Sequence, residues 1–207
     1  MGQELTILSI NKGSIQELLD TNAGGNKSVL SAINKVSVSN CDAPNSQFVG
    51  NLGLDGDEQA NPEVHGGIDK AVYAYPIEHY DFWTECLRVN NSRVEKLNFG
   101  AFGENLTIQG FNESSVFVGD QWLIGSVLLE VVRFREPCFK FNIKMGWSGA
   151  AKAMVQSNQS GWYLKVLKTG TIRAGDTVDV LPGPRELSIL IQSSSFYNKS
   201  KQSDLWS

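Results

Sequence analysis

The chain has 207 residues, of which 41% are hydrophobic and 19% charged, and its formal net charge is −4. This balance is typical of a folded domain and not of a disordered chain. A negative net charge argues against a nucleic-acid polymer as partner, because phosphate backbones bind basic surfaces. Neither a membrane-spanning run nor a signal-peptide pattern is visible, so we expect no membrane association. The three irregularly spaced cysteines form no disulfide framework, which favours a reducing, cytoplasmic location.

Short β-branched or apolar runs between glycines predict strands in the first half of the chain. These runs fall at 5–10, in the second half of 28–38, at 48–54 (a strand or a loop) and at 71–75. Pro76 suits the first position of a helix, and apolar residues then recur with roughly helical period over 77–87. We therefore expect a helix over 77–87.

The second half of the chain alternates short strands with closely spaced turns. Strands are predicted at 116–118, 121–124, 127–135, 162–168 and 177–181, and a short helix at 150–157. Turns this close together favour antiparallel pairing in a sandwich or barrel. The predicted class is mainly β with a few short helices. We expect one domain over 1–185 and a C-terminal tail over 186–207, frayed or only loosely docked from Ser193 onward.

Cys138 is the strongest candidate for chemistry. Pro137 ends regular strand pairing, so the cysteine falls just past a strand end, where sites tend to form. Arg133 and Arg135 share one face of an extended strand and would project together beside the thiol, with Lys140 on its other side. Nearby cations favour the thiolate, which is both a nucleophile and a ligand for soft metals. A buried structural cysteine is the plainer alternative.

A second candidate run, His65-Gly66-Gly67, is followed closely by Asp69 and Lys70. The glycines leave backbone N–H groups open to an oxyanion, and Lys70 could meet a phosphate. Asp69 could accept from a guanidine-like N–H edge. A glycine turn with a surface Asp-Lys pair would look the same.

The loop that contains Glu104 and Asn105 is a third candidate. Both side chains could read the donor and acceptor edge of a heterocycle, although the loop could equally be a simple turn. Farther along the chain, Trp162 and Tyr163 are expected in the core or in a pocket wall. One pocket built from the three candidate runs would bind an anionic cofactor and offer it a sulfur ligand.

Several familiar enzyme signatures are absent from the sequence. There is no dinucleotide-binding GxGxxG, phosphate-binding GxxxxGK[ST], HExxH or GxSxG motif. Two histidines cannot supply a three-histidine metal site. A hydrolase that pairs Cys138 with His65 stays open as a lesser alternative, because spatial adjacency is not readable from sequence.

Taken in order, these runs resemble the MOSC domain, named for the C-terminal domain of molybdenum cofactor sulfurases, and above all its stand-alone YiiM-type members. The resemblance covers about 53–180. It is carried by GLDGDEQA at 53–60, HGGIDKAV at 65–72, YPIEHY at 75–80, GAFGENLT at 100–107, VFVGD at 116–120, REPCFK at 135–140 and GWYL at 161–164. Phe134 stands where the family commonly has proline, and the segment after Arg185 is short for the helical C-terminal domain of YiiM-type chains.

The resemblance implies a MOSC-type β-barrel and a molybdenum-pterin cofactor (molybdopterin). Cys138 matches the family cysteine thought to ligate molybdenum or to carry sulfur. The expected cofactor-binding residues are His65, Gly66, Gly67, Asp69, Lys70, Glu104, Asn105, Arg135 and Lys140. YiiM-type proteins are associated with reducing N-hydroxylated bases such as hydroxylaminopurine.

Two main functions remain open at this point. As an enzyme, the protein would reduce the N–O bond of a small molecule, with His65 or a carboxylate supplying a proton and a separate protein supplying electrons. As a carrier, it would bind the cofactor, or a persulfide on Cys138, without redox chemistry of its own. A β-barrel with an empty or repurposed pocket is the bland alternative.

Overall fold

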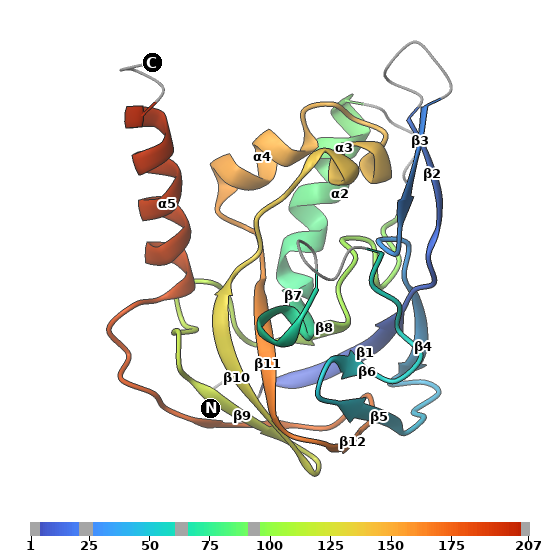
Figure 1. Ribbon diagram of the computed structural model, residues 1–207, viewed down its shortest axis with the longest axis vertical. Helices are drawn as coiled ribbons and strands as arrows, with labels where there is room; N and C mark the ends of the chain where they lie inside the picture. Colours follow the sequence, from blue (N-terminus) through green and yellow to red (C-terminus); the bar gives the residue numbers. More distant parts are fainter. Residues whose placement is uncertain (1–4, 21–26, 61–65, 91–95, 204–207) are drawn as a thin grey trace.

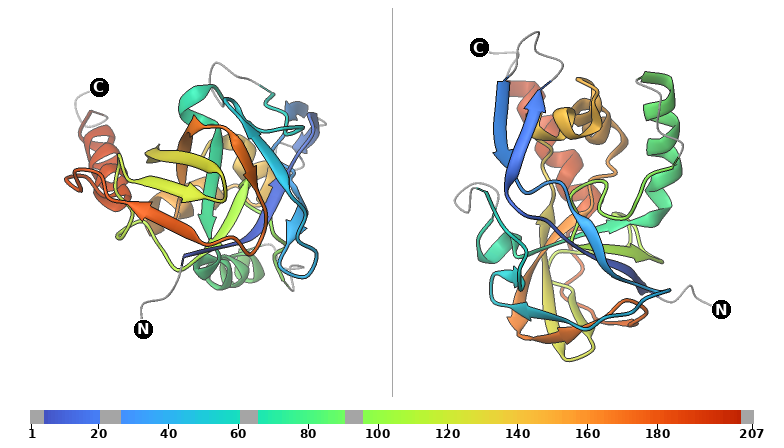
Figure 2. Two further views of the ribbon diagram at one scale, coloured as in Figure 1. Left: turned by 90° about the horizontal axis from the view of Figure 1, so that it is seen from below. Right: turned by 90° about the vertical axis from the view of Figure 1, so that its right-hand side faces the viewer.

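The computed structural model describes residues 5–20, 27–60, 66–90 and 96–203. Within them, an eight-stranded sheet has the strand order β13-β9-β10-β11-β7-β8-β1-β4. All its neighbouring strands are antiparallel except the parallel pair β7 and β8. The sheet curls strongly on itself, which is seen best from below in Figure 2. The predicted class, mainly β with a barrel-like sheet and a few short helices, is confirmed.

The strands are β1 Thr6–Lys12, β2 Gln16–Asp20, β3 Lys27–Ser31, β4 Val36–Asn40, β5 Gln47–Gly50, β6 Gly53–Leu54, β7 Val72–Pro76, β8 Leu106–Gln109, β9 Gln121–Ile124, β10 Val127–Phe134, β11 Trp162–Lys168, β12 Gly170–Ile172 and β13 Val178–Leu181. The helices are the 3-10 turns η1 Ile68–Lys70 and η2 Ile77–His79, then α2 Tyr80–Asn90, α3 Phe139–Met145, α4 Ala150–Ser157 and α5 Ile189–Ser203. Helices α3 and α4 lie at one end of the sheet, and α5 stands beside it (Figure 1). None of the described helices is long and apolar enough to cross a bilayer.

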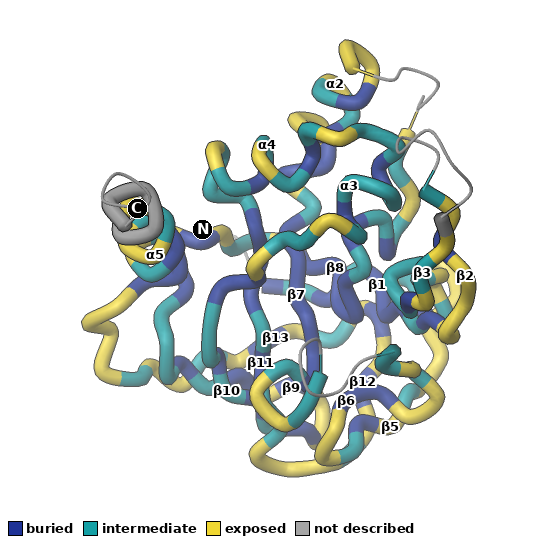
Figure 3. Tube along the Cα trace, turned by 45° about the horizontal axis from the view of Figure 1, so that its top comes forward, coloured by how far each residue is buried: buried dark blue, intermediate teal, exposed yellow. Residues whose placement is uncertain are grey.

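The core fills the inside of the curled sheet. Along β10, alternate residues Val127, Leu129 and Val131 are fully buried, as period-two alternation requires. Two large rings, Trp122 and Trp162, meet edge to face inside, with centroids 5.8 Å apart. Figure 3 shows the buried strands running beneath more exposed loops and helix faces.

A second, aromatic cluster joins α2 and α3 to the end of the sheet. Trp83 and Leu87 of α2 pack here with Phe102 and Phe141, and Phe141 lies in the first turn of α3. Pro76 precedes η2 and α2 as the sequence predicts, although the first turn is a 3-10 turn and the helix runs on to Asn90. This cluster fixes the chain segments on which the candidate residues lie.

Gly161 lies where β11 begins, against the neighbouring strand β7. Its φ is +64°, and a Cβ there would lie 2.4 Å from the carbonyl oxygen of Ala74. Only glycine permits both the dihedral and this approach. The Gly161 carbonyl accepts from the backbone N–H of Arg135 at 3.2 Å, so this glycine helps to fix the start of the segment that carries Cys138.

Some sequence expectations are wrong. Residues 116–118 form no strand: Phe117 makes an isolated bridge with Ser188, because the chain turns again at Gly119. The strand expected in the second half of 28–38 begins only at Val36.

The expected tail is also different, because its residues 189–203 form α5. This helix packs on β10, where the ring centroids of its Phe196 and Tyr197 lie 5.4 and 5.6 Å from that of Phe134, and its first residue, Ile189, is buried in the core. The side-chain oxygen of Gln192 accepts from the backbone N–H of Phe134 at 2.8 Å. Apolar residues spaced at helical period dock a segment whose average composition is polar. The domain boundary at residue 185 stays a prediction.

Candidate functional site

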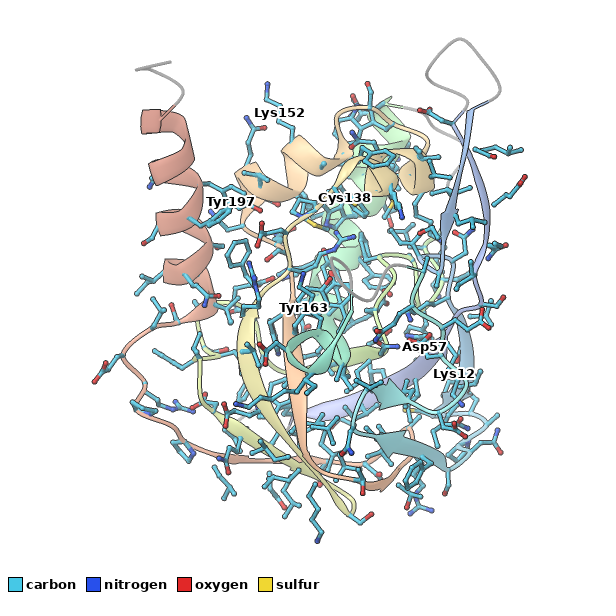
Figure 4. The ribbon with its side chains drawn as sticks, in the orientation of Figure 1. Lys12, Asp57, Cys138, Lys152, Tyr163 and Tyr197 are labelled. Atoms are coloured by element: carbon cyan, nitrogen blue, oxygen red, sulfur yellow. The ribbon has the colours of Figure 1, made fainter. Side chains whose placement is uncertain are left out.

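A cleft with an empty volume of about 750 Å³ brings parts of all three candidate runs together. Its wall includes five of the predicted residues, namely Lys70, Asn105, Arg135, Cys138 and Lys140. They come from η1, from the loop before β8, from the segment between β10 and α3, and from the first turn of α3. Figure 4 shows Cys138 near α3 and α4, with Tyr163 of β11 below it and Asp57 toward β4.

The position of Cys138 follows from the local sequence. Strand β10 ends at Phe134, Pro137 cannot donate to a ladder, and Cys138 has an extended backbone (φ −122°, ψ 176°) at the N-cap of α3. The side chain is half-buried and lines the cleft. A sulfur is therefore held at a fixed point on the cleft wall and remains reachable from the cleft.

Arg135 is a buried cation with no carboxylate partner in the described part of the chain. It is 5% exposed, and its guanidinium carbon lies 4.7 Å from the ring centroid of Phe141 and 5.5 Å from that of Tyr73. One guanidinium nitrogen donates to the Met154 sulfur at 3.0 Å. Burial disfavours its charge, but Tyr73, Tyr163 and Cys138 outweigh this and raise the pKa of Arg135. A charge buried without a counter-ion suits an anionic ligand.

The expectation that both arginines would flank the thiol is wrong for Arg133. The β10–β11 register shifts between Val131 and Arg133, so the alternation of faces is not carried through to Arg135. Arg133 lines a different hollow beside α5 and forms an ion pair with Glu136. Lys140, the cation on the other side, does reach the cleft wall, and its ammonium donates to the Leu30 carbonyl at 2.9 Å.

The described residues of the His-Gly-Gly-Ile-Asp-Lys run do not all line the cleft. Lys70 lines the cleft, with its ammonium 6.0 Å from the ring centroid of Tyr163; burial and the charge of Arg133 lower the pKa of Lys70. Gly66, Gly67 and the exposed Asp69 are not part of the cleft wall. The backbone N–H of Gly67 donates to the side chain of Gln59 at 3.3 Å, so it is not open to an oxyanion as predicted. His65 lies outside the described residues.

Glu104 and Asn105 point to different places. Asn105 lines the cleft, whereas Glu104 is completely buried beneath it. The Glu104 carboxylate accepts from backbone N–H groups of the preceding loop, from Thr107 and from Tyr80. Burial raises the pKa of Glu104, and these hydrogen bonds oppose that shift. In this arrangement Glu104 holds the loop together, and Asn105 faces the ligand space.

An ion pair that no sequence pattern predicts lies in the cleft wall, away from Cys138 (Figure 4). The ammonium of Lys35 lies 2.5 Å from both carboxylate oxygens of Asp57, and the two side chains are 8% and 6% exposed. Asp57 lies in the run at 53–60 that carries part of the family resemblance, but nothing local in the sequence marks Lys35 as its partner. Of the pair Trp162-Tyr163, Trp162 is in the core and Tyr163 in the cleft wall, and both places were expected.

The side chains around Cys138 fit an anionic group that a single sulfur helps to hold. Arg135 supplies an uncompensated buried charge, and Lys70 and Lys140 add further positive charge to the wall. In the described residues, no group of three or more His, Cys, Asp or Glu side chains is placed to hold a metal ion.

Comparison with known proteins identifies the family. The model of the MOSC domain matches residues 61–179. The chain belongs to the MOSC domain family. This family is associated with the molybdenum cofactor.

Three relatives illustrate how far the likeness extends. The chain is 36% identical to protein YiiM of Escherichia coli K12 over 67% of its own length and 60% of that protein. It is 38% identical to a protein of Gibberella moniliformis named "Reductase", over 66% of this chain and 24% of that one. The crystal structure of YiiM from Geobacillus stearothermophilus superposes with a TM-score of 0.71 at 31% identity, over 94% of this chain and 85% of that one. The match spans less than two thirds of both sequence relatives.

Proposed function

We propose that this protein binds a molybdenum-pterin cofactor in the cleft, with Cys138 as a molybdenum ligand, and reduces the N–O bond of N-hydroxylated small molecules. When bound, the cofactor supplies two-electron redox chemistry at the metal. The observation that carries the proposal is the pairing of the cleft-facing Cys138 sulfur with the buried, unneutralised Arg135.

Each cleft residue has a role in this proposal that follows from its chemistry. Arg135 holds negative charge near the sulfur, since its guanidinium stays protonated at any physiological pH. Lys70 and Lys140 attract the anionic phosphate of the cofactor to the cleft. The amide of Asn105 can both donate to and accept from a planar heterocycle. His65 stays a candidate proton donor by its sequence position.

The overall reaction needs two electrons and two protons: the N–O bond breaks, the nitrogen keeps one new N–H bond, and the oxygen leaves as water. The sequence carries no recognisable nicotinamide or flavin motif, so we propose that a separate protein delivers the electrons. The reductase name of one relative supports this class of reaction but says nothing of the substrate of this chain.

The test is the turnover of Cys138→Ser after production in a host that makes the cofactor. The wild-type protein should reduce an N-hydroxylated purine when given a low-potential electron donor, and C138S should fall to background while keeping its circular dichroism spectrum. Cys41→Ser is the matched control, because Cys41 is exposed and outside the cleft. Full activity in C138S would contradict the proposal.

A further inference from the structure

Lys35 lies between two hollows of the molecule. It lines the cleft and also a second hollow, which we call the back groove. The back groove has an empty volume of about 1120 Å³ and is lined by Lys35, Val36, Ser37, Leu87, Lys96, Leu97, Asn98, Phe99, Ala101, Lys144 and Met145. Lys35 is the one residue that the described walls of both hollows share. Lys35 therefore lies in the wall between the cleft and the back groove.

The partner of Lys35 is held so that it tolerates a change in the charge of the lysine. Asp57 accepts not only from Lys35 but also from the backbone N–H of Gly13 and from the side-chain amide of Asn105, each at 2.8 Å. If Lys35 lost a proton, the carboxylate would keep two hydrogen bonds. It would not become an orphaned buried anion, which is the costly outcome.

The charges around Lys35 come from several elements. Burial is the largest influence and lowers the pKa of Lys35, while Asp57 and, more weakly, Glu104 act to raise it. Lys144 of α3 and Lys96 of the loop after α2 also line the back groove. A lysine whose ammonium is destabilised by burial is a better proton donor near neutral pH than an ordinary surface lysine.

We propose that Lys35 donates one of the two protons consumed in the cleft and is then reprotonated by water in the back groove. This inference rests on the proposed function. As the N–O bond breaks, a proton passes from the ammonium to the departing oxygen, which leaves as water, and the electron pair comes from the protein donor. The neutral amine then takes a proton from water. Lys70 is less suited, because a cofactor and substrate in the cleft would cover it, whereas the back groove stays open.

The deciding variant is Lys35→Arg. Arginine keeps the positive charge and can pair with Asp57, but it does not release a proton at working pH. Loaded K35R should retain its molybdenum and its KM, while kcat falls by about a hundredfold, as expected for loss of a general acid. Lys165→Arg is the control, since Lys165 pairs with Glu130 away from the cleft. An unchanged kcat in K35R overturns the proposal.

A measurement without cofactor keeps the inference separate from the proposed function. In metal-free protein labelled with ¹⁵N at the lysine side chains, NMR should show Lys35 titrating below ordinary lysines. Its ammonium hydrogens should exchange with water more slowly in Val36→Trp, which obstructs the back groove at a 67% exposed position. Leu52→Trp, 63% exposed and outside the back groove, is the control.

The proposed function and the role of Lys35 would be disproved by different results. A wild-type protein that carries the cofactor but reduces no N-hydroxylated compound defeats the proposed function. An ordinary lysine titration, or exchange that is equally fast in V36W and L52W, defeats the role of Lys35 even if the wild type is an active reductase.

Discussion

The two walls of the cleft balance their charges in opposite ways. On the Cys138 wall, the guanidinium of Arg135 is buried against aromatic rings and a thioether, with no acidic partner among the described residues. On the opposite wall, Lys35 and Asp57 neutralise one another, and Asp57 is hydrogen-bonded by two further groups. The first wall therefore carries a positive charge without an acidic partner, whereas the two charges of the second wall neutralise each other.

This difference has consequences for the stability of the protein. A buried charge without an acidic counter-ion is held here only by rings and a thioether, and an anionic ligand would supply the counter-ion. A paired and fully hydrogen-bonded ion pair instead fixes the segments that it joins, here the chain before β4, the loop after β6 and the loop before β8. Substitutions on the two walls should therefore change stability very differently.

The largest effect on stability is expected for Asp57→Asn. The variant leaves the buried ammonium of Lys35 without its counter-ion, so the free energy of unfolding should fall by about 3–5 kcal/mol. Urea denaturation at pH 7 measures it. The matched control is Glu85→Gln, which breaks the exposed Glu85–Arg88 pair and should cost less than about 1 kcal/mol. Equal losses in the two variants would refute the distinction.

Glu104→Gln should have the next largest effect. All the groups that contact the Glu104 carboxylate are donors, so the new NH₂ group would face the backbone N–H of Phe102. Two buried donors then face one another without an acceptor, and the free energy of unfolding should fall by about 1–3 kcal/mol. Glu186→Gln, at an exposed position, serves as the control for thermal unfolding. A neutral result for E104Q would mean that the loop does not depend on this carboxylate.

Arg135→Met should have a small net effect on stability although the side chain is buried. The variant loses cation–π contacts worth about 1–2 kcal/mol, but it also removes an unpaired buried charge. We expect the ligand-free protein to change by no more than about 1 kcal/mol, while molybdenum is lost from protein made in the cofactor-competent host. A loss of stability as large as that of D57N would show that Arg135 has an anionic partner within the protein.

The smallest effect concerns pH and Lys144, whose pKa burial lowers below its ordinary value of 10.5. Between the lowered pKa and 10.5, the unfolded chain binds more protons than the folded one, so the stability of the wild type rises with pH in that window. Lys144→Met should be slightly more stable at pH 7, with the advantage disappearing near pH 10.5. Lys152→Met, which removes an exposed lysine, is the control for the loss of one positive charge.

Local patterns in the sequence predict much of the fold. Alternation and turns predict β10 and β11, and the short helix predicted at 150–157 is α4. Pro137 correctly marks where the strand gives way to the segment that holds Cys138. These features depend on neighbours within a few residues. The docking of α5 cannot be predicted in this way, because it depends on contacts between its few apolar residues and β10, which is distant in the sequence.

The candidate site is predictable only in part, for the same reason. That Cys138, Arg135 and Lys70 face one cleft agrees with the sequence interpretation. The inward turn of Glu104 depends on donors that the folded loop presents, and the Lys35–Asp57 pair joins residues 22 positions apart in sequence. No periodicity in the sequence encodes either arrangement.

The most direct test of the account counts the sulfur ligands of molybdenum by X-ray absorption at the molybdenum edge. Wild-type protein and the C41S variant should give the same spectrum, with C138S lacking one Mo–S interaction. Identical sulfur coordination in C138S and wild type would contradict the claim that the Cys138 wall is built to hold the cofactor.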